Sequence, residues 1–276
     1  MKTAIIDVGG GMRGCYGAGV VEYLLDNDIH FDIGIGVSAG SSNLVTLKSE
    51  QKGRLRRFYE VYPKRKEYMG IREYLRHGSF FNVKYIFEDL SMKGMEDEVD
   101  IARCERNPMQ FYLVATDAET GKPVYFHPDT FVPAMHEASC NLPVLNKAVS
   151  FDGHEYYDGG VSDPIPWKKA FELGAEKLVV VLTKPETEKR DPKRDEGPAK
   201  LLARKYPEAG KALALRAETY NRQIDEITSL RNEGKLIIVS PDDTCGVTTT
   251  RHKPEDVRNL YWKGYEDAAA IKDYLK

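Results

Sequence analysis

In the stretch FDIGIGVSAGSSN (31–43), an apolar run ends in GVSAG (36–40) and a helix-like segment follows. This is the G-x-S-x-G pattern of a nucleophile elbow, which holds a serine on a tight turn between a strand and a helix. Side chains two residues before and after the serine would clash with that strand and helix, so Gly36 and Gly40 suit the turn. The helix also points its first N–H groups towards Ser38 and favours negative charge there. The pattern predicts a serine nucleophile.

A second glycine-rich turn, VGGGMRG (8–14), directly follows the first apolar run of the chain. Its G-x-G-x-x-G spacing also fits a dinucleotide-binding fingerprint, but that fold needs an acidic residue at the end of its second strand. Here Asp32 stands at the start of that strand and no acid follows it, which counts against a nucleotide-dependent oxidoreductase. A phosphate-binding Walker loop is excluded because G-K-[ST] is missing.

Beside an elbow serine, the same turn predicts an oxyanion hole, since a neighbouring parallel strand would bring bare backbone N–H groups next to Ser38. Glycine suits this place because a Cβ would block the substrate and restrict φ. For Gly9 or Gly14 alone, a simple strand-to-helix turn explains the residue equally well. The predicted turn comprises Gly9, Gly10, Gly11, Met12, Arg13 and Gly14.

A serine nucleophile also needs a base, and the sequence offers two kinds. Asp158 stands at a strand end before Gly159 and Gly160, which allow a sharp turn that exposes the carboxylate. An Asp in D-G-G is by itself only a common turn residue. Of the six histidines, only His252 comes late enough to copy the order of an α/β-hydrolase triad, and it lies in a polar stretch. We therefore predict Asp158 as the base.

Short apolar runs alternate with helix-like segments along the chain, which is typical of an α/β protein. The runs 109–117 and 123–127 flank a glycine-containing turn and predict a hairpin. The charged, proline-containing segment 184–200 is expected to be an exposed loop. Further strands are expected at 3–8, 31–37, 155–158, 177–183 and 235–241, and helices at 16–26, 39–50 and 167–173.

The composition is that of an ordinary globular protein, with 276 residues, 41% hydrophobic residues, 30% charged residues and a net charge of −3. This charge does not suggest a nucleic-acid partner, which usually requires a strongly basic face. No apolar run approaches the roughly 18 residues of a membrane-spanning helix, and no signal peptide is recognised. The four cysteines form no C-x-x-C pair, so we expect neither a disulfide nor a zinc site, and a cytoplasmic location.

The segment 52–66 carries seven Lys or Arg residues with Phe58, Tyr59 and Tyr62 between them. A solvated helix face is the simpler interpretation of this pattern. A patch that contacts a membrane surface or anionic lipid is the alternative.

Three blocks in order, GGGMRG (9–14), GVSAG (36–40) and DGG (158–160), resemble the patatin-like phospholipase family. The stretch 139–145 is similar to a family helix with the pattern S-x-x-x-P, and the stretch 220–242 is similar to bacterial members. The resemblance implies an α/β/α sandwich with a mostly parallel central sheet, formed by one domain of residues 1–276 in which 205–276 pack as a C-terminal extension.

The same resemblance implies a Ser–Asp dyad without histidine, no metal and no cofactor. It assigns Ser38 as the nucleophile, Asp158 as the base, and Gly10 and Gly11 with their neighbours as the oxyanion hole. Arg13 would stabilise that loop near a lipid phosphate, or form an ordinary salt bridge. The expected activity is a phospholipase A or lysophospholipase-like esterase, acting on a lipid or hydrophobic ester with peripheral membrane contact. A catalytically silent regulatory or lipid-binding protein that retains the pocket is the alternative; the oligomeric state is left open.

Overall fold

The apolar runs of the sequence form one eight-stranded sheet in the computed structural model, which describes residues 1–276. The sheet order is β5-β6-β3-β2-β1-β7-β8, and β4 pairs with β3 outside this path. Within the sheet, the neighbouring strands β3, β2, β1, β7 and β8 all run parallel to one another, whereas β4 and β6 run antiparallel to β3. The strands are β1 (Thr3–Asp7), β2 (Ile33–Val37), β3 (Gln110–Asp117), β4 (Pro123–Phe126), β5 (Val149–Phe151), β6 (His154–Asp158), β7 (Lys177–Val181) and β8 (Leu236–Val239).

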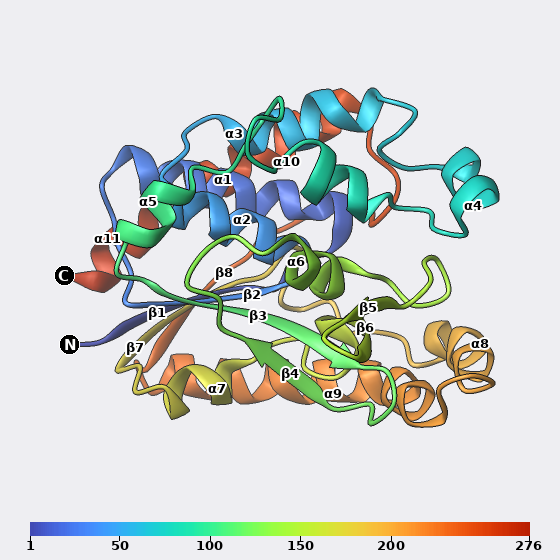
Figure 1. Ribbon diagram of the computed structural model, residues 1–276. Coiled ribbons are helices and arrows are strands. Elements are labelled where there is room, and N and C mark those ends of the chain that lie inside the picture. The colour runs from blue at the N-terminus through green and yellow to red at the C-terminus, as the bar shows by residue number, and fades with distance from the viewer.

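Helices cover both faces of this sheet, as Figure 1 shows. In the view of Figure 1, α1, α2 and α10 lie above the strands and α7 and α9 lie below them. The helices are α1 (Cys15–Asp26), α2 (Ala39–Lys48), α3 (Arg54–Arg56), α4 (Ile71–His77), α5 (Ile101–Arg106), α6 (Pro133–Cys140), α7 (Trp167–Glu172), α8 (Lys193–Leu202), α9 (Pro207–Asn232), α10 (Pro254–Asp267) and α11 (Ala269–Leu275). The predicted α/β/α sandwich with a mostly parallel sheet is confirmed.

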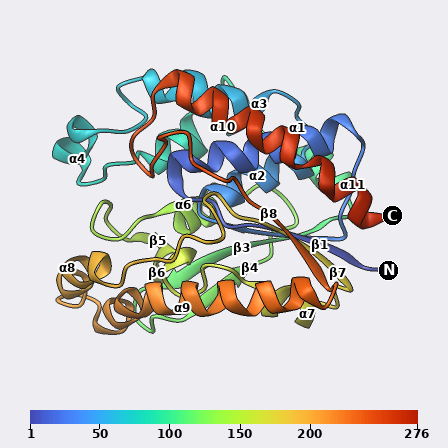
Figure 2. The ribbon, with the colours of Figure 1, turned by 180° about the vertical axis from the view of Figure 1, so that it is seen from behind.

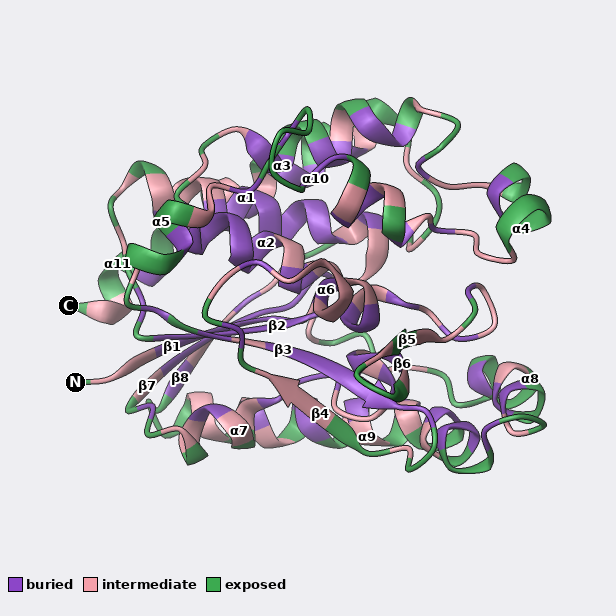
Figure 3. Ribbon diagram, in the orientation of Figure 1, coloured by how far each residue is buried: buried purple, intermediate pink, exposed green.

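The sheet has a hydrophobic core on each face, and successive residues of a central strand pack into opposite cores because side chains alternate across a sheet. In β1, Ile5 joins the core above the sheet, while Ala4 and Ile6 join the core below it. Both sides are buried, which explains why these strands read as continuous apolar runs in the sequence. Figure 3 shows the buried strands and α2 at the centre of the molecule.

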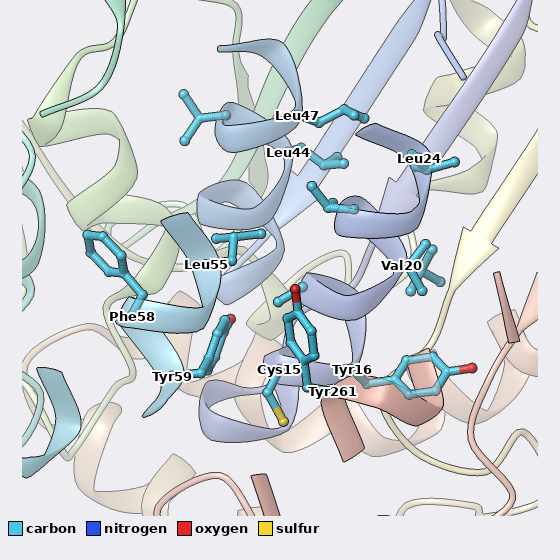
Figure 4. Close-up of a cluster of buried hydrophobic side chains, with 14 of the residues drawn as sticks. Cys15, Tyr16, Val20, Leu24, Leu44, Leu47, Leu55, Phe58, Tyr59 and Tyr261 are labelled. Carbon is cyan, nitrogen blue, oxygen red and sulfur yellow. The ribbon is translucent and has the colours of Figure 1, made fainter. Parts of the chain in front are cut away.

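The upper core joins α1 and α2 to the C-terminal helix α10, and Figure 4 shows its side chains. Two glycines allow α1 and α10 to approach closely. A Cβ on Gly19 would lie 1.9 Å from the carbonyl oxygen of Tyr261, and a Cβ on Gly264 would lie 2.0 Å from that of Tyr16. Figure 2 shows α10 lying along this face of the molecule. The contact brings residues about 250 positions apart in the sequence side by side, as the hydrogen bond from Tyr16 to Asp267 (2.8 Å) shows.

The prediction of an exposed loop over 184–200 is wrong in its second half, because Lys193–Leu202 form α8. The sequence pattern concealed this helix, since Asp195 is buried as the ion-pair partner of Arg216 on α9. Ala199 and Leu202 supply the remaining buried contacts. A charged residue that is buried by a partner from another helix cannot be distinguished from a solvated one in the sequence.

The aromatic residues of the segment 52–66 do not face solvent. Phe58, Tyr59 and Tyr62 are buried in the upper core. Arg54 is also buried, and its guanidinium contacts Asp97 at 3.6 Å. The aromatic side chains therefore cannot insert into a membrane interface in this conformation. None of the helices combines the length and apolar character needed to cross a bilayer.

Candidate active site

Ser38 stands on the sharp turn between β2 and α2, with backbone angles of φ 57° and ψ −133°. This conformation is unfavourable for a residue with a Cβ and is held by close packing on both sides. A Cβ on Gly36 would lie 2.5 Å from the Cα of Ser41, and a Cβ on Gly40 would lie 2.0 Å from the carbonyl oxygen of Asp7. The two glycines of the motif are therefore required by the backbone that surrounds the turn.

Neighbouring elements hold the Ser38 backbone from both ends. Its N–H donates to the hydroxyl of Ser139 on α6 (3.1 Å). Its carbonyl oxygen accepts from the N–H and the hydroxyl of Ser41 (2.9 and 2.8 Å). Ser139 lies in the stretch that resembles the family's S-x-x-x-P helix, and its contact gives this motif a physical role.

The glycine turn after β1 lies beside Ser38 because β1 and β2 are parallel neighbours, with Asp7 opposite Gly36. Gly9, Gly10 and Gly11 have φ values of 63°, 125° and 61°. A Cβ on Gly9 would lie 2.7 Å from the backbone nitrogens of Ala39 and Gly40, so the turn packs directly against the start of α2.

The six residues of the predicted oxyanion turn are not equivalent as donors. The N–H of Gly9 donates to Asp7 Oδ1 (2.9 Å), and the N–H of Met12 donates to the carbonyl oxygen of Thr249 (3.1 Å). The N–H groups of Gly10 and Gly11 donate to no acceptor in the protein. This leaves the N–H groups of Gly10 and Gly11 as the candidate donors to an oxyanion, while the hydrogen bonds of Gly9 and Met12 hold the turn in shape. Gly14 is buried at the start of α1, where a Cβ would lie 2.4 Å from the Tyr59 hydroxyl.

Asp7 organises this turn and was missed in the sequence. It is fully buried at the end of β1, and its Oδ2 accepts from Asn43 Nδ2 on α2 (2.8 Å). Asn43 in turn accepts from the Tyr59 hydroxyl (3.2 Å) and donates to the carbonyl oxygen of Gly14 (3.0 Å). Burial raises the pKa of Asp7 to about 6, against hydrogen bonds from Asn43 and Gly9 that lower it. The one sequence signal was an acidic residue within the apolar run TAIIDV.

Asp158 ends β6 and is only 3% exposed. Its Oδ1 accepts from the N–H of Gly160 (2.8 Å), whereas its buried Oδ2 has no hydrogen-bond partner. A Cβ on Gly159 would lie 2.2 Å from the carbonyl oxygen of Val114, so the predicted role of Gly159 and Gly160 in turning the chain fits the packing. One carboxylate oxygen is thus fixed and the other is free.

Burial raises the pKa of Asp158, and the Ser38 side chain, the Gly160 N–H, Arg216 and Arg190 oppose this shift. The Ser38 side chain is therefore close enough to favour the ionised carboxylate, although the two side chains form no well-aligned hydrogen bond. Catalytic hydrogen bonds are often loose in the absence of substrate.

Two hollows meet at Ser38. The first, which we call the apolar slot, has a volume of about 70 Å³ and walls that include Tyr59, Tyr68, Phe81, Val83, Ile86 and Phe87. The second, the polar chamber, has a volume of about 100 Å³ and contains Ser38 and Asp158 together. Its other walls include Gly10, Gly11, Arg13, Lys184, Arg190, Arg216 and Tyr220. The site therefore has an apolar and a cationic side with the serine between them.

None of the six histidines lines either hollow. His252 lies on the loop before α10, where its Nδ1 contacts the carbonyl oxygen of Thr250 (3.1 Å).

Arg13 lines the polar chamber, and its buried Nε has no hydrogen-bond partner. The salt bridge that was the alternative role for Arg13 is not formed. The residues Lys184, Arg190 and Tyr220 were not predicted as part of the site, since none of them belongs to the three motif blocks that selected it.

A family model described as "Patatin-like phospholipase" matches residues 8–171, more than half of the sequence. The chain belongs to the patatin-like phospholipase family. A second model, "Domain of unknown function (DUF6363)", matches residues 206–276, which contain α9, β8, α10 and α11.

The chain is 29% identical to the uncharacterized protein YjjU of Escherichia coli (strain K12) over 187 residues. This alignment covers 67% of the chain but only 52% of YjjU, so the chain spans about half the length of this relative. The crystal structure of VipD from Legionella pneumophila shares the fold, with a TM-score of 0.50, 15% identity and coverage of 99% of this chain and 67% of VipD. The type III effector protein ExoU has a TM-score of 0.46 at 11% identity, covering 99% of this chain and 53% of ExoU.

Proposed function

We propose that the protein is a serine acyl hydrolase that cleaves lipid or other hydrophobic esters with a Ser38–Asp158 dyad. The observation that carries this proposal is the meeting of three features at Ser38. These are the elbow backbone, a buried carboxylate with one free oxygen, and two backbone N–H groups without acceptors. Each has a defined task in acyl transfer.

In the first half of the reaction, the Ser38 hydroxyl oxygen attacks the ester carbonyl and its proton passes to Asp158 Oδ2. The N–H groups of Gly10 and Gly11 stabilise the negative charge on the carbonyl oxygen. Asp158 then gives the proton to the leaving alcohol, and an acyl-enzyme remains. In the second half, Asp158 takes a proton from water, the hydroxide attacks the acyl-enzyme, and the fatty acid leaves as the proton returns to Ser38.

The apolar slot supports a hydrocarbon acyl chain as the group that is transferred. Eleven of its fourteen lining residues are hydrophobic, and Ser38 stands at its wall. A chain placed in this slot removes apolar surface from water, which favours binding by about 25 cal/mol per Å². The fatty-acid part of a lipid is the substrate group that this chemistry suits.

Labelling with a fluorophosphonate probe separates this proposal from a silent lipid-binding protein. We expect the probe to label the wild-type protein at Ser38 and to leave Ser38→Ala unlabelled. An unlabelled but folded wild-type protein would favour the silent alternative.

Three purified variants test the dyad itself, with kcat/KM measured on a short-chain p-nitrophenyl ester. Ser38→Ala and Asp158→Asn should each lose several orders of magnitude, as members of a catalytic unit do. His252→Ala is the matched control for a triad and should keep most of its activity. A folded but inactive His252→Ala variant together with an active Asp158→Asn variant would contradict the dyad and indicate a catalytic triad that contains His252.

We also propose that α4 provides the contact with a lipid surface. Ile71, Tyr74 and Leu75 are 73%, 46% and 79% exposed, and their i, i+3, i+4 spacing places them on one helix face. Arg72 and Arg76 are exposed beside them. An apolar face flanked by arginines has the chemistry of an anionic membrane surface as its partner.

The connection of α4 to the apolar slot supports this position. The residue before the helix, Gly70, donates its N–H to the carbonyl oxygen of Phe80 (2.9 Å), and Met69 bridges to Phe81, a wall of the slot. Lipid bound at α4 would therefore lie near the slot.

Sedimentation with vesicles tests this contact. The double variant Ile71→Ser/Leu75→Ser should lose binding to vesicles of phosphatidylglycerol and phosphatidylcholine, while Leu215→Ser, an exposed leucine of α9, should not. A dimer that dissociates in the double variant would show that a second copy, rather than a membrane, covers α4.

A further inference from the structure

The three glycines of the turn after β1 have no side chains that could hold its N–H groups in one direction. Gly9, Gly10 and Gly11 all have positive φ values, and glycine restricts its own backbone less than any other residue. An oxyanion hole is effective only when its donors are oriented before the reaction begins. The orientation of this turn must therefore be fixed by contacts from other segments.

Two such contacts lie on either side of the free donors. The peptide group that precedes Gly9 is held by Asp7, whose Oδ1 accepts from the Gly9 N–H (2.9 Å). The peptide group that precedes Met12 is held by the carbonyl oxygen of Thr249, which accepts from the Met12 N–H (3.1 Å). Neither contact acts on the peptide group between Gly9 and Gly10, which carries the Gly10 N–H.

Thr183 supplies the contact with that peptide group. Thr183 is buried, and its hydroxyl donates to the carbonyl oxygen of Gly9. The peptide group between Gly9 and Gly10 is trans, so its carbonyl and its N–H point in opposite directions within one plane. A contact that holds the Gly9 carbonyl therefore also fixes the direction of the Gly10 N–H.

The sheet brings Thr183 to this position. The strands β1 and β7 are parallel neighbours with Asp7 opposite Val181, and Gly9 and Thr183 each follow two residues after this pair. A Cβ on Gly10 would lie 2.8 Å from the Thr183 hydroxyl oxygen, so a glycine at this position allows the close approach. Thr183 lines the polar chamber together with Ser38 and Gly10, although it lies outside the three motif blocks.

We propose that Thr183 is a positioning residue of the oxyanion hole, which orients the Gly10 N–H by holding the Gly9 carbonyl. The proposal rests on the acyl-hydrolase function above and adds a residue to its machinery. Because Thr183 acts on the donor rather than on the substrate, its effect belongs to the transition state, in which negative charge develops on the ester carbonyl oxygen.

Removal of the Thr183 hydroxyl tests this role in the purified full-length protein, with a short-chain p-nitrophenyl ester as substrate. Thr183→Val keeps the shape of the side chain, and Thr183→Ala adds no volume if valine disturbs the packing. Both should lower kcat at least about ten-fold with little change in KM, as part of the roughly 10²- to 10³-fold loss that removal of a whole oxyanion donor causes. Thr183→Ser retains the hydroxyl and should retain most of kcat.

Thr130→Val is the matched control for the loss of a threonine hydroxyl. The Thr130 hydroxyl is also buried, but it has no hydrogen-bond partner, and Thr130 lines neither the apolar slot nor the polar chamber. This variant should keep the wild-type kcat. Circular dichroism and the Tm of each variant show whether it is folded.

Inhibition by an alkyl trifluoromethyl ketone measures binding of the oxyanion directly. The Ser38 oxygen adds to the ketone carbon, the serine proton passes to Asp158, and the former carbonyl oxygen becomes a bound oxyanion. The inhibition constant should therefore rise in Thr183→Val and Thr183→Ala by about the factor by which kcat/KM falls. It should stay constant in Thr130→Val.

Several outcomes would overturn the proposal. These are a wild-type kcat in either folded variant without the hydroxyl, a loss in Thr183→Ser as large as that in Thr183→Val, and a higher KM with unchanged kcat, which would indicate a direct contact with bound substrate. An active wild-type protein with unaffected Thr183 variants contradicts this inference alone, whereas a folded wild-type protein that is inactive on the ester contradicts the proposed function.

Discussion

Asp158 illustrates how burial at a single residue adjusts the proposed chemistry. A carboxylate is a weak base for a serine hydroxyl, and burial raises the pKa of Asp158 above its ordinary value of 3.8. A higher pKa makes the carboxylate a better proton acceptor, provided that it remains ionised at the working pH. Arg190 and Arg216 oppose the shift and keep the ionised form accessible.

This balance predicts an acidic limb in the pH profile. The protonated form of Asp158 cannot accept a proton, so kcat/KM on a neutral ester should rise with pH through the pKa of Asp158, at a midpoint above 3.8. Arg190→Gln should move the midpoint to higher pH, because it removes a positive charge that stabilises the carboxylate. The measurement is kcat/KM from pH 4 to 8, with circular dichroism at each pH. Constant activity down to pH 4 in the folded protein contradicts the role of Asp158.

Asp7 supports a second prediction at this scale. Asp7→Asn keeps an oxygen for the N–H of Gly9 but presents an amide NH₂ to the NH₂ of Asn43, so that hydrogen bond is lost. We expect kcat/KM to fall about ten-fold or more, because a buried donor is left unsatisfied beside the glycine turn. Asp32→Asn is the control, since Asp32 contacts Thr3 at the other end of β1 and should leave activity intact. Unchanged activity in Asp7→Asn would show that the turn does not depend on this contact.

At the scale of elements, the strand–turn–helix unit of β2 and α2 tolerates a methyl group at one position and not at another. A Cβ on Gly34 meets the flexible end of Met109 at 3.1 Å, whereas a Cβ on Gly36 meets backbone atoms of Ser41 at 2.5 Å. The two glycines lie two residues apart in β2 and hence on the same face of the strand. The difference arises from the neighbour, since a side chain can move aside and the start of α2 cannot.

Gly36→Ala should therefore lower the free energy of unfolding by about 1–3 kcal/mol, the usual cost of an overpacked core. Gly34→Ala, in the same strand, should cost less than about 1 kcal/mol because Met109 can adapt. Urea denaturation of both variants measures the difference. Equal destabilisation would mean that the tight turn around Ser38 is not responsible for the requirement.

At the scale of the whole molecule, the contact between α1 and α10 raises the question of whether residues 1–276 behave as one domain. The protein has two tryptophans, Trp167 on α7 below the sheet and Trp262 on α10 above it. We propose that both layers unfold together, since Gly19 and Gly264 allow α1 and α10 to pack with backbone contacts and β8 pairs with β7.

Two single-tryptophan variants, Trp167→Phe and Trp262→Phe, report on these layers separately. We expect each variant's tryptophan fluorescence to change at the same urea concentration as its far-UV circular dichroism, as in a two-state transition. If the fluorescence of Trp262 changed at a lower concentration than the dichroism, the C-terminal region would be a separate unit.

The sequence predicts seven of the eight strands in their order along the chain and the positions of the central turns, but it misses β5. These features are local, because a G-x-S-x-G motif between an apolar run and a helix needs only its neighbours to form an elbow. The same holds for the glycine turn after β1 and for the D-G-G turn after β6. Three ordered blocks were therefore enough to predict the fold class and to select Ser38 and Asp158.

The tertiary structure was needed to show which backbone N–H groups of these turns lack an acceptor and which residues outside the motifs line the site. Gly9 and Gly10 are alike in sequence, but the N–H of Gly9 is occupied by Asp7 and the N–H of Gly10 is not. Arg190 and Tyr220 lie outside the three motif blocks, and the tertiary packing places both in the chamber that holds Ser38. The physical reason is that hydrogen-bond satisfaction and burial depend on partners distant in sequence, and no local pattern specifies those partners.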